Sequence, residues 1–452
     1  MSFKYASKLD DLVSKSMEKA QAPGVSLALI KDGEIVYSKG YGARCLEENL
    51  PATRDTLYGI GSCAKSFISL ATMMMVQEGK ITVDLPIKDY LPVEVGVKDS
   101  PITVKSLMSH SSGFPSLGMA DVLIAKMSLG GHPIPMTSAD DFYSFLNNAG
   151  DWVDAKPREK YYYLNTGYTL LGLLLEKLTG KSLEDYLREN IWKPLGMNRT
   201  TLVKEKFNGD SDRMTAYWKD SEGKVVPTVH PFHELIYAPG GILSSVLESC
   251  SYINMYLGNT KPLIDEDLLA EMVMIHTPRP DTVFGQGGYG YGWGVMEFNG
   301  ETMITHTGST GVSGANYLFI PDRNIGVVYL TNMGYWGNLI PHAAAAMLMD
   351  QDPAEALPYL SKQLFYEKLS GTYTSYRDIN TVEIKPQGGV LMGTQRSKFG
   401  TMTVPLIPVS DDPEETEFLV YGGEYGPMKV WFELDGDEHR FYDERWVFKK
   451  PI

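Results

Sequence analysis

The chain has 452 residues, of which 43% are hydrophobic and 21% charged, a composition that suits a globular protein of two or three domains. Its net charge of −15 argues against nucleic acid or an anionic membrane as the main partner. Residues 1–10 hold no apolar signal region, and no run of about 18 apolar residues occurs, which predicts a cytoplasmic protein. We expect the three cysteines, Cys45, Cys63 and Cys250, to form no disulfide framework.

The N-terminal segment predicts one helix followed by a hairpin. Residues 6–21 show the amphipathic spacing that is typical of a helix. The apolar runs 25–30 and 35–41 flank the turn sequence Lys31-Asp-Gly-Glu34, and this combination predicts two antiparallel strands.

The next predicted helix carries a serine and a lysine at its start. Ser62 and Lys65 form a Ser-x-x-Lys pattern, and the helix is predicted to end at Gly79. Because three residues are nearly one helical turn, the hydroxyl and the amine project from the same face. A lysine whose pKa is depressed by desolvation can act as the base that a serine nucleophile needs. The same pattern also occurs at Ser16 and Lys19 in a charged helix, so the pair alone does not establish a site.

Two further motifs follow in order along the chain. Tyr163-Leu-Asn165 begins a helical stretch inside residues 80–235, a region of predicted helices and polar loops. His306-Thr-Gly308 lies between two apolar runs. Successive strands are predicted at residues 302–307, 315–320 and 326–331, with a turn at Pro321–Asn324 between the last two.

The character of the sequence changes near residue 350. The segments Asp350–Pro353 and Leu357–Pro358 are typical of a connector rather than of a sheet or a core helix. Beyond Leu369, short apolar or aromatic runs alternate with turn signals, which predicts a small barrel or sandwich. These runs are residues 369–373, 381–384, 388–392, 418–421, 429–434 and 446–448.

The ordered set Ser-x-x-Lys, Tyr-x-Asn and His-Thr-Gly resembles the serine β-lactamase and penicillin-binding protein superfamily, in particular its class C or CubicO group. The resemblance implies an α+β fold, with an antiparallel sheet flanked by helices and a helical subdomain, over residues 1–350. The order of the two domains, a catalytic domain followed by a small barrel at residues 351–452, is similar to that of the archaeal self-compartmentalising peptidases of this group. It implies a lipocalin-like β-barrel and a homo-oligomer, with an octamer as one form.

The resemblance also implies roles for the motif residues. Ser62 is the expected nucleophile, and Lys65 takes its proton or holds the charge of the site. Tyr163 is the expected general base or relay that then protonates the leaving group, and Asn165 orients Lys65 and a substrate amide. The sequence leaves open whether Lys65 or Tyr163 is the base.

His306 departs from the lactamase pattern, which has a lysine at this position. A histidine is only partly charged near neutral pH, so the case for penicillins or for peptides recognised by a free C-terminus is weaker. The segment Thr307, Gly308 and Ser309 is expected to hold an extended substrate. The oxyanion hole is expected to combine the Ser62 and Ser309 N–H groups.

Other motifs in the chain lack the context that they need. Gly180-Lys-Ser182 is similar to the end of a phosphate-binding loop, but position 175 is Leu where the first glycine of that loop belongs. Gly285–Gly290 fits a dinucleotide-binding glycine pattern, but no strand–helix unit frames it, so we predict a flexible loop near the cleft. His230 and His233 have no thiol or carboxylate set beside them, so neither a metal nor a cofactor is expected. His110 is expected to be a structural residue away from the nucleophile.

The sequence therefore predicts a serine hydrolase that acts through a Ser62 acyl-enzyme. A peptidase for short peptides, including peptides with D-residues, is the leading hypothesis. A carboxylesterase or weak β-lactamase with the same residues is the second. A non-catalytic binding protein on this scaffold is the third. No nucleic acid and no membrane partner are expected.

Overall fold

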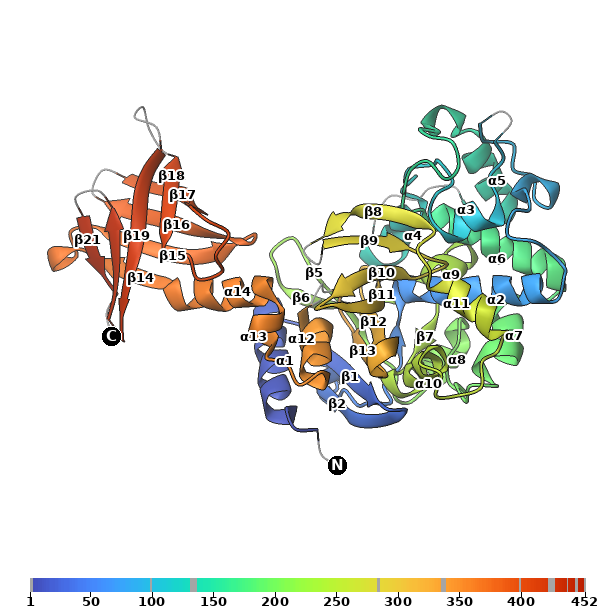
Figure 1. Cartoon of the computed structure of the whole chain (residues 1–452), viewed down its shortest axis with the longest axis horizontal. Coiled ribbons are helices and arrows are strands. Elements are labelled where there is room, and N and C mark those ends of the chain that lie inside the picture. Colours follow the sequence, from blue (N-terminus) through green and yellow to red (C-terminus); the bar gives the residue numbers. More distant parts are fainter. Residues whose placement is uncertain are drawn as a thin grey trace. The chain divides into compact units, whose positions relative to one another are not determined.

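The computed structural model of the chain describes residues 3–97, 100–130, 136–282, 285–334, 339–397, 400–421, 427–436, 438–443 and 446–450 (Figure 1). It divides into two compact units, Met1–Asp350 and Gln351–Ile452. Within the described parts, no helix has both the length and the apolar character that crossing a membrane requires.

The first unit is built around a nine-stranded antiparallel sheet in the order β3-β2-β1-β13-β12-β11-β10-β9-β8. Its strands are β1 (Gly24–Lys31), β2 (Glu34–Cys45), β3 (Leu50–Pro51), β8 (Thr277–Thr282), β9 (Gly285–Tyr289), β10 (Gly294–Phe298), β11 (Glu301–Ser309), β12 (Gly314–Ile320) and β13 (Ile325–Thr331). The predicted hairpin and the three predicted strands at residues 302–331 are confirmed. β1 pairs with β13, so the two ends of the unit meet in the middle of the sheet.

Helices cover both faces of this sheet (Figure 1). The α-helices of the unit are α1 (Ala6–Ala20), α2 (Ala64–Gln77), α3 (Val104–Met108), α4 (Met119–Ile124), α5 (Ala139–Asn147), α6 (Asn165–Thr179), α7 (Leu183–Leu187), α8 (Lys204–Gly209), α9 (Glu234–Gly240), α10 (Val246–Tyr256), α11 (Glu266–Met272) and α12 (Leu339–Leu348). Short 3₁₀ or π turns are η1 (Gly61–Cys63), η2 (Ile87–Asp89), η3 (Ala125–Leu129), η4 (Gly150–Trp152), η5 (Arg188–Trp192) and η6 (Pro321–Arg323). The predicted first helix is therefore confirmed as α1.

Helix α2 lies at the centre of the unit. Every residue from Ala64 to Met75 is buried, which is typical of a helix that is packed on all sides. The left-handed Gly79, with φ of +69°, follows the end of this helix, close to the predicted position. Helix α2 is thus held rigidly by the main hydrophobic core.

Residues 80–235 form the predicted helical region, with one addition. A hairpin of β5 (Ala216–Lys219) and β6 (Val225–Thr228) was not predicted, although the turn that joins its strands contains Gly223 with φ of +78°. Two further short strands, β4 (Tyr58–Gly59) and β7 (Leu243–Ser244), pair with each other.

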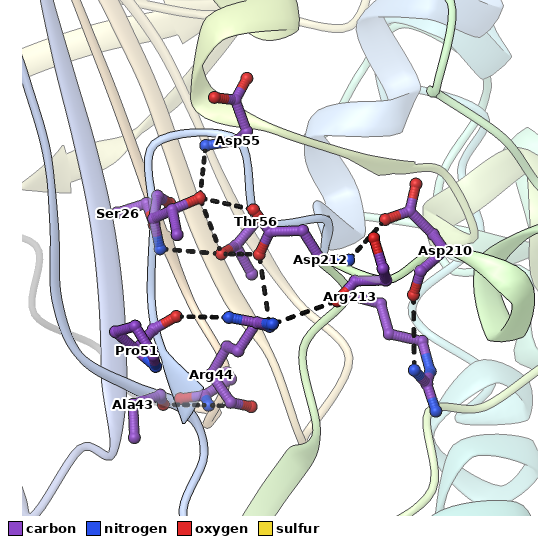
Figure 2. Close-up of polar contacts among 12 residues, drawn as sticks. Ser26, Ala43, Arg44, Pro51, Asp55, Thr56, Asp210, Asp212 and Arg213 are labelled. Atoms are coloured by element: carbon purple, nitrogen blue, oxygen red, sulfur yellow. Dashed lines mark hydrogen bonds and ion pairs between the residues drawn. The ribbon is translucent and has the colours of Figure 1, made fainter. Parts of the chain in front are cut away.

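A polar network holds the segment that leads into the nucleophile (Figure 2). The Asp212 carboxylate accepts hydrogen bonds from the Thr53 hydroxyl at 2.6 Å and the Thr56 hydroxyl at 2.7 Å. Arg44 pairs with the same carboxylate at 3.4 Å and donates to the Pro51 carbonyl at 2.8 Å. Thr56 lies six residues before Ser62, so this network fixes the backbone segment that leads to Ser62.

The second unit is a closed barrel of eight antiparallel strands, in which β14 pairs with β21 to complete the ring. The strands are β14 (Gly371–Thr374), β15 (Thr381–Gln387), β16 (Val390–Ser397), β17 (Gly400–Pro408), β18 (Glu417–Tyr421), β19 (Pro427–Asp435), β20 (Glu438–Asp443) and β21 (Trp446–Lys449), with the turn η7 (Tyr376–Asp378). A lipocalin-like barrel was predicted, and the closed ring confirms it.

The two segments predicted as a connector, Asp350–Pro353 and Leu357–Pro358, are mostly non-helical, but the chain between and after them is helical. It contains α13 (Pro353–Ala356) and α14 (Pro358–Leu369), and α14 contributes Phe365, Tyr366 and Leu369 to the core of the barrel. Neither helix was predicted. The two prolines occupy the first positions of these helices, where a missing N–H costs nothing.

Candidate active site

The Ser-x-x-Lys pair lies where a tight turn becomes the buried helix. Ser62 is in the middle of η1, and Lys65 is in the first turn of α2. The Lys65 Nζ lies 3.0 Å from the Ser62 Oγ, as the helical spacing predicted. Ser62 remains partly exposed, whereas Lys65 is fully buried.

The Lys65 amine is surrounded by hydrogen-bond acceptors. Nζ donates to the Asn165 Oδ1 at 2.7 Å and to the Pro239 carbonyl at 2.8 Å. These two oxygens can only accept, so they use the two N–H bonds of a neutral amine and leave its lone pair for the Ser62 hydroxyl. Burial holds the pKa of Lys65 well below its ordinary value, which favours this neutral form. The arrangement therefore lets Lys65 accept the serine proton.

Tyr163 lies near Ser62 and Lys65, two residues before α6 begins at Asn165. Its ring faces the Lys65 Nζ at 4.8 Å, and its hydroxyl interacts with that of Ser62. Burial is the main cause that raises the pKa of Tyr163 well above its ordinary value, so Tyr163 is a neutral phenol near pH 7. A neutral phenol can donate a proton but is not the starting base.

The His110 ring packs against the Tyr163 ring. The His110 Nδ1 accepts a hydrogen bond from the Leu164 N–H at 3.1 Å, and its ring lies 4.3 Å from the Tyr163 ring, centroid to centroid. The structure agrees with the prediction of a structural hydrogen-bonding residue, since these contacts of His110 are to Leu164 and to the Tyr163 ring. The chain brings residues 110 and 163 together because the Tyr162 N–H also bonds the His110 carbonyl at 2.8 Å.

His306 is held as a neutral ring. Its Nδ1 lies 2.6 Å from the Thr307 carbonyl oxygen, which can only accept, so Nδ1 carries the proton. The Nε2 then accepts from the Tyr289 hydroxyl at 2.8 Å. Burial, with a smaller contribution from Lys65, lowers the pKa of His306 to about 3. His306 therefore supplies no positive charge to the site at neutral pH.

Two glycines let the nucleophile turn approach β11. A Cβ atom on Gly308 would lie 1.9 Å from the Ile60 carbonyl oxygen and 3.0 Å from the Ser62 N, and one on Gly61 would lie 2.4 Å from the Ser309 N. The backbones can pack this closely only without side chains. The approach places the Ser62 and Ser309 amides, the predicted oxyanion donors, beside each other. Next to them the buried Cys63 thiol donates to the His306 carbonyl at 3.1 Å, a packing role.

A cavity of about 720 Å³ opens onto these groups. The cavity is lined by five of the predicted site residues: Ser62, Tyr163, His306, Thr307 and Ser309. Lys65 and Gly308 are buried beneath this lining. Asn165 lines a small adjoining pocket that also contacts Ser62. Further lining residues that the sequence reasoning missed include Asp121, Tyr161, Arg279 and Tyr289.

Comparisons with known proteins agree with this geometry. Residues 9–348 match the Beta-lactamase family, and residues 353–449 match the Pab87 octamerisation domain. The chain belongs to the Beta-lactamase family. An octameric penicillin-binding protein homologue from Pyrococcus abyssi is 36% identical, with a TM-score of 0.89 over 98% of this chain and 100% of that chain. The family is one of serine hydrolases that includes penicillin-binding protein homologues and class C β-lactamases.

More distant relatives cover the first unit. Protein flp of Staphylococcus aureus is 24% identical over 74% of this chain, and the chain spans 65% of the length of that relative. The unguisins hydrolase ungD' of Aspergillus campestris is 24% identical over 75% of this chain and 64% of its own length. A class C β-lactamase of known structure, 20% identical with a TM-score of 0.62 over 77% of this chain and 96% of that chain, shares the fold.

The remaining motif predictions for this Beta-lactamase family member concern two histidines, His230 and His233, and the segment Gly285–Gly290. His230 is buried against Phe207 and Phe232, and His233 caps α9, so both are structural. In the part of the chain that the structure describes, no cluster of ligands suits a metal ion. The prediction of a flexible loop at Gly285–Gly290 was wrong: most of it is β9, although it does reach the cleft through Tyr289.

The close approach of η1 and β11 gives a direct test of the oxyanion donors. Gly308→Ala is expected to slow labelling of Ser62 by a fluorophosphonate by about 100-fold or more, because its Cβ would push the Ser62 and Ser309 amides apart. The matched control is Gly209→Ala, because a Cβ there would meet nothing within 4 Å. Both labelling rates are measured by intact-protein mass spectrometry. A Gly308→Ala variant that labels at the wild-type rate would contradict this role.

Proposed function

We propose that this protein is a serine peptidase that hydrolyses short peptides through an ester on Ser62. The observation that carries the proposal is the contact of the buried Lys65 amine with the Ser62 hydroxyl, with its other two partners being acceptors only. In this geometry the amine lone pair faces the proton that must leave when the serine oxygen attacks a carbonyl.

The proposed acylation begins with transfer of the Ser62 proton to Lys65. The serine oxygen bonds to the substrate carbonyl carbon, and the negative charge on the carbonyl oxygen is stabilised by the Ser62 and Ser309 N–H groups. Tyr163 then gives its proton to the leaving nitrogen as the C–N bond breaks, and Lys65 returns a proton to Tyr163. Water attacks the serine ester by the same steps in reverse and restores the free hydroxyl.

The free edge of β11 supports a peptide rather than a small ester. β10 pairs with β11 only as far as Thr305, whereas β12 follows it to Ser309. Residues 306–309 therefore offer backbone groups on the β10 side, toward the cavity, to which an extended peptide can add as a further strand. A small ester would use the same nucleophile without this edge, so carboxylesterase activity is the alternative.

Replacing the nucleophile tests the proposal. Ser62→Ala is expected to abolish cleavage of short L- and D-peptides and of a nitrophenyl ester, because no acyl-enzyme can form. Ser16→Ala, in the second Ser-x-x-Lys pattern of the chain, serves as the matched control. Cleavage is followed by liquid chromatography with mass spectrometry. Ester turnover without peptide turnover would favour the carboxylesterase, and activity that survives in Ser62→Ala would contradict the site.

The pH dependence of acylation tests the base. Burial lowers the pKa of Lys65, so the neutral amine is expected to form as the pH rises through a value well below 10.5, and labelling should rise with it. His306→Gln is expected to change the rate but not the position of this limb, because His306 is already neutral above about pH 3. Lys65→Arg should not label at any pH, since a guanidinium keeps its proton. A limb that shifts in His306→Gln would assign the titration to histidine.

We also propose that the protein forms a homo-oligomer through its second unit. The match of residues 353–449 to an octamerisation domain and the octameric relative support this assembly. Multi-angle light scattering of the full chain is expected to give a mass eight times that of the monomer. A monomeric mass at micromolar concentration would contradict the assembly.

A further inference from the structure

Tyr289 is fixed in a cluster of rings at the wall of the cavity. It ends β9, is 1% exposed and lines the cavity that also contacts Ser62. Its ring lies 4.6 Å from the ring of His110 and 5.9 Å from that of Tyr161, centroid to centroid. Because packing holds the ring from these two directions, the position of its hydroxyl oxygen is set before any substrate arrives.

The Tyr289 hydroxyl is one of two groups that orient the His306 ring. Its oxygen lies 2.8 Å from the His306 Nε2, and the His306 Nδ1 lies 2.6 Å from the Thr307 carbonyl oxygen. A carbonyl oxygen can only accept, so the proton of the neutral ring is on Nδ1 and Nε2 needs a donor. If the Tyr289 hydroxyl were removed, Nε2 would be a buried acceptor that has lost its partner. The two contacts together therefore fix both the tautomer and the orientation of the ring.

The other groups that face His306 favour a neutral ring but do not orient it. Lys65 on α2 and Arg279 on β8 are cations or potential cations, and both disfavour a positive charge on the ring. The Asp121 carboxylate lines the same cavity, but it forms no ion pair with His306 within the described ranges. Burial raises the pKa of a thiol and of phenols and lowers that of an imidazole. It keeps four further neighbours uncharged near pH 7, namely Cys63, Tyr163, Tyr289 and His110.

The second partner of His306, the Thr307 carbonyl, belongs to the free edge of β11. The Thr310 N–H bonds the Ser313 carbonyl, just before β12, at 3.1 Å. Backbone groups alternate in direction along a strand, so those of Ser309 and Thr307 face the opposite side, which β10 leaves unpaired. Through its Nδ1–H, the His306 ring thus holds a peptide group on the same edge as the Ser309 N–H, the expected oxyanion donor.

We propose that Tyr289 is a positioning residue of this active site, which orients His306 and through it the Thr307 carbonyl on the substrate edge of β11. The inference rests on the proposed function, to which it adds a residue that acts on the serine reaction through another side chain. When the hydroxyl is removed, the ring can turn away from Thr307, and Nε2 can take up a second proton. Both changes release the edge of the strand on which the acyl group of the substrate would lie.

A double-mutant cycle measures this action on the rate at which a fluorophosphonate labels Ser62. Tyr289→Phe is expected to slow labelling about 10-fold, which is within the range for a buried hydrogen bond whose partner is left unpaired. In the His306→Gln background the same change should alter the rate by about twofold or less, since the side chain through which it acts is gone. Tyr41→Phe is the matched control, because it removes a buried hydroxyl that bonds Asp10 at 2.7 Å and does not line the cavity.

The pH profile of labelling separates this role from a purely structural one. A hydrogen bond donated to Nε2 stabilises the neutral ring, so its loss should raise the pKa of His306 from about 3 toward the ordinary value of 6.5. Below the raised value the ring in Tyr289→Phe is charged, which disfavours transfer of the Ser62 proton to Lys65. Labelling should therefore fall in a second limb as the pH decreases through that value. The Tyr289→Phe/His306→Gln double variant should lack this limb.

The outcomes distinguish the inference from the function on which it rests. Full-rate labelling of Tyr289→Phe overturns the inference and leaves the nucleophile standing. An equal loss of rate with and without His306→Gln also overturns it, because Tyr289 would then act on the fold alone, and so does a Tyr289→Phe profile without the second limb. If wild-type Ser62 is not labelled, the proposed function fails, and crystal structures of the wild type and Tyr289→Phe still test the positioning. A turned His306 ring or a displaced Thr307 carbonyl supports it, and unchanged positions overturn it.

Discussion

The burial of one amine organises this active site. A lysine ammonium inside a packed core is costly, and its environment must either neutralise it or satisfy every N–H bond. The structure gives Lys65 two obligatory acceptors, Asn165 and Pro239, and leaves the third direction for Ser62. Because α2 is enclosed on all sides, water does not compete for these contacts. This arrangement supports the proposed role of the Ser62 hydroxyl as the nucleophile.

The same arrangement requires several distant segments to meet within a few ångströms. Asn165 begins one helix and Pro239 lies near the end of another, while the turn with Ser62 packs on β11. Gly61 and Gly308 are needed where the turn and the strand touch. The network around Asp212 holds the approach to the turn from the opposite direction. The geometry of the nucleophile is thus a property of the whole first unit.

The polar side chains around the cavity come from different strands of the sheet. The neutral His306 is a hydrogen-bonding member of β11, and its partner Tyr289 comes from a strand that was predicted to be a loop. Arg279 lines the same cavity from β8.

The sequence by itself determined the parts of this protein that depend on local spacing. Ser62 and Lys65 lie together because three residues make nearly one helical turn. Apolar runs predicted β1, β2, β11, β12 and β13 of the sheet and most strands of the barrel, but not β3, β8, β9 and β10. Only the tertiary structure shows that the Lys65 amine is placed to be neutral. Its two acceptors, Asn165 and Pro239, lie 100 and 174 residues away in the sequence, and no local pattern predicts that they surround the amine. Arg279 and Tyr289 had no sequence signal for the same reason: the cavity that they line is formed by segments that are distant in the sequence. The helices at Pro353 and Pro358 were missed because a proline has opposite meanings at the first turn of a helix and inside it.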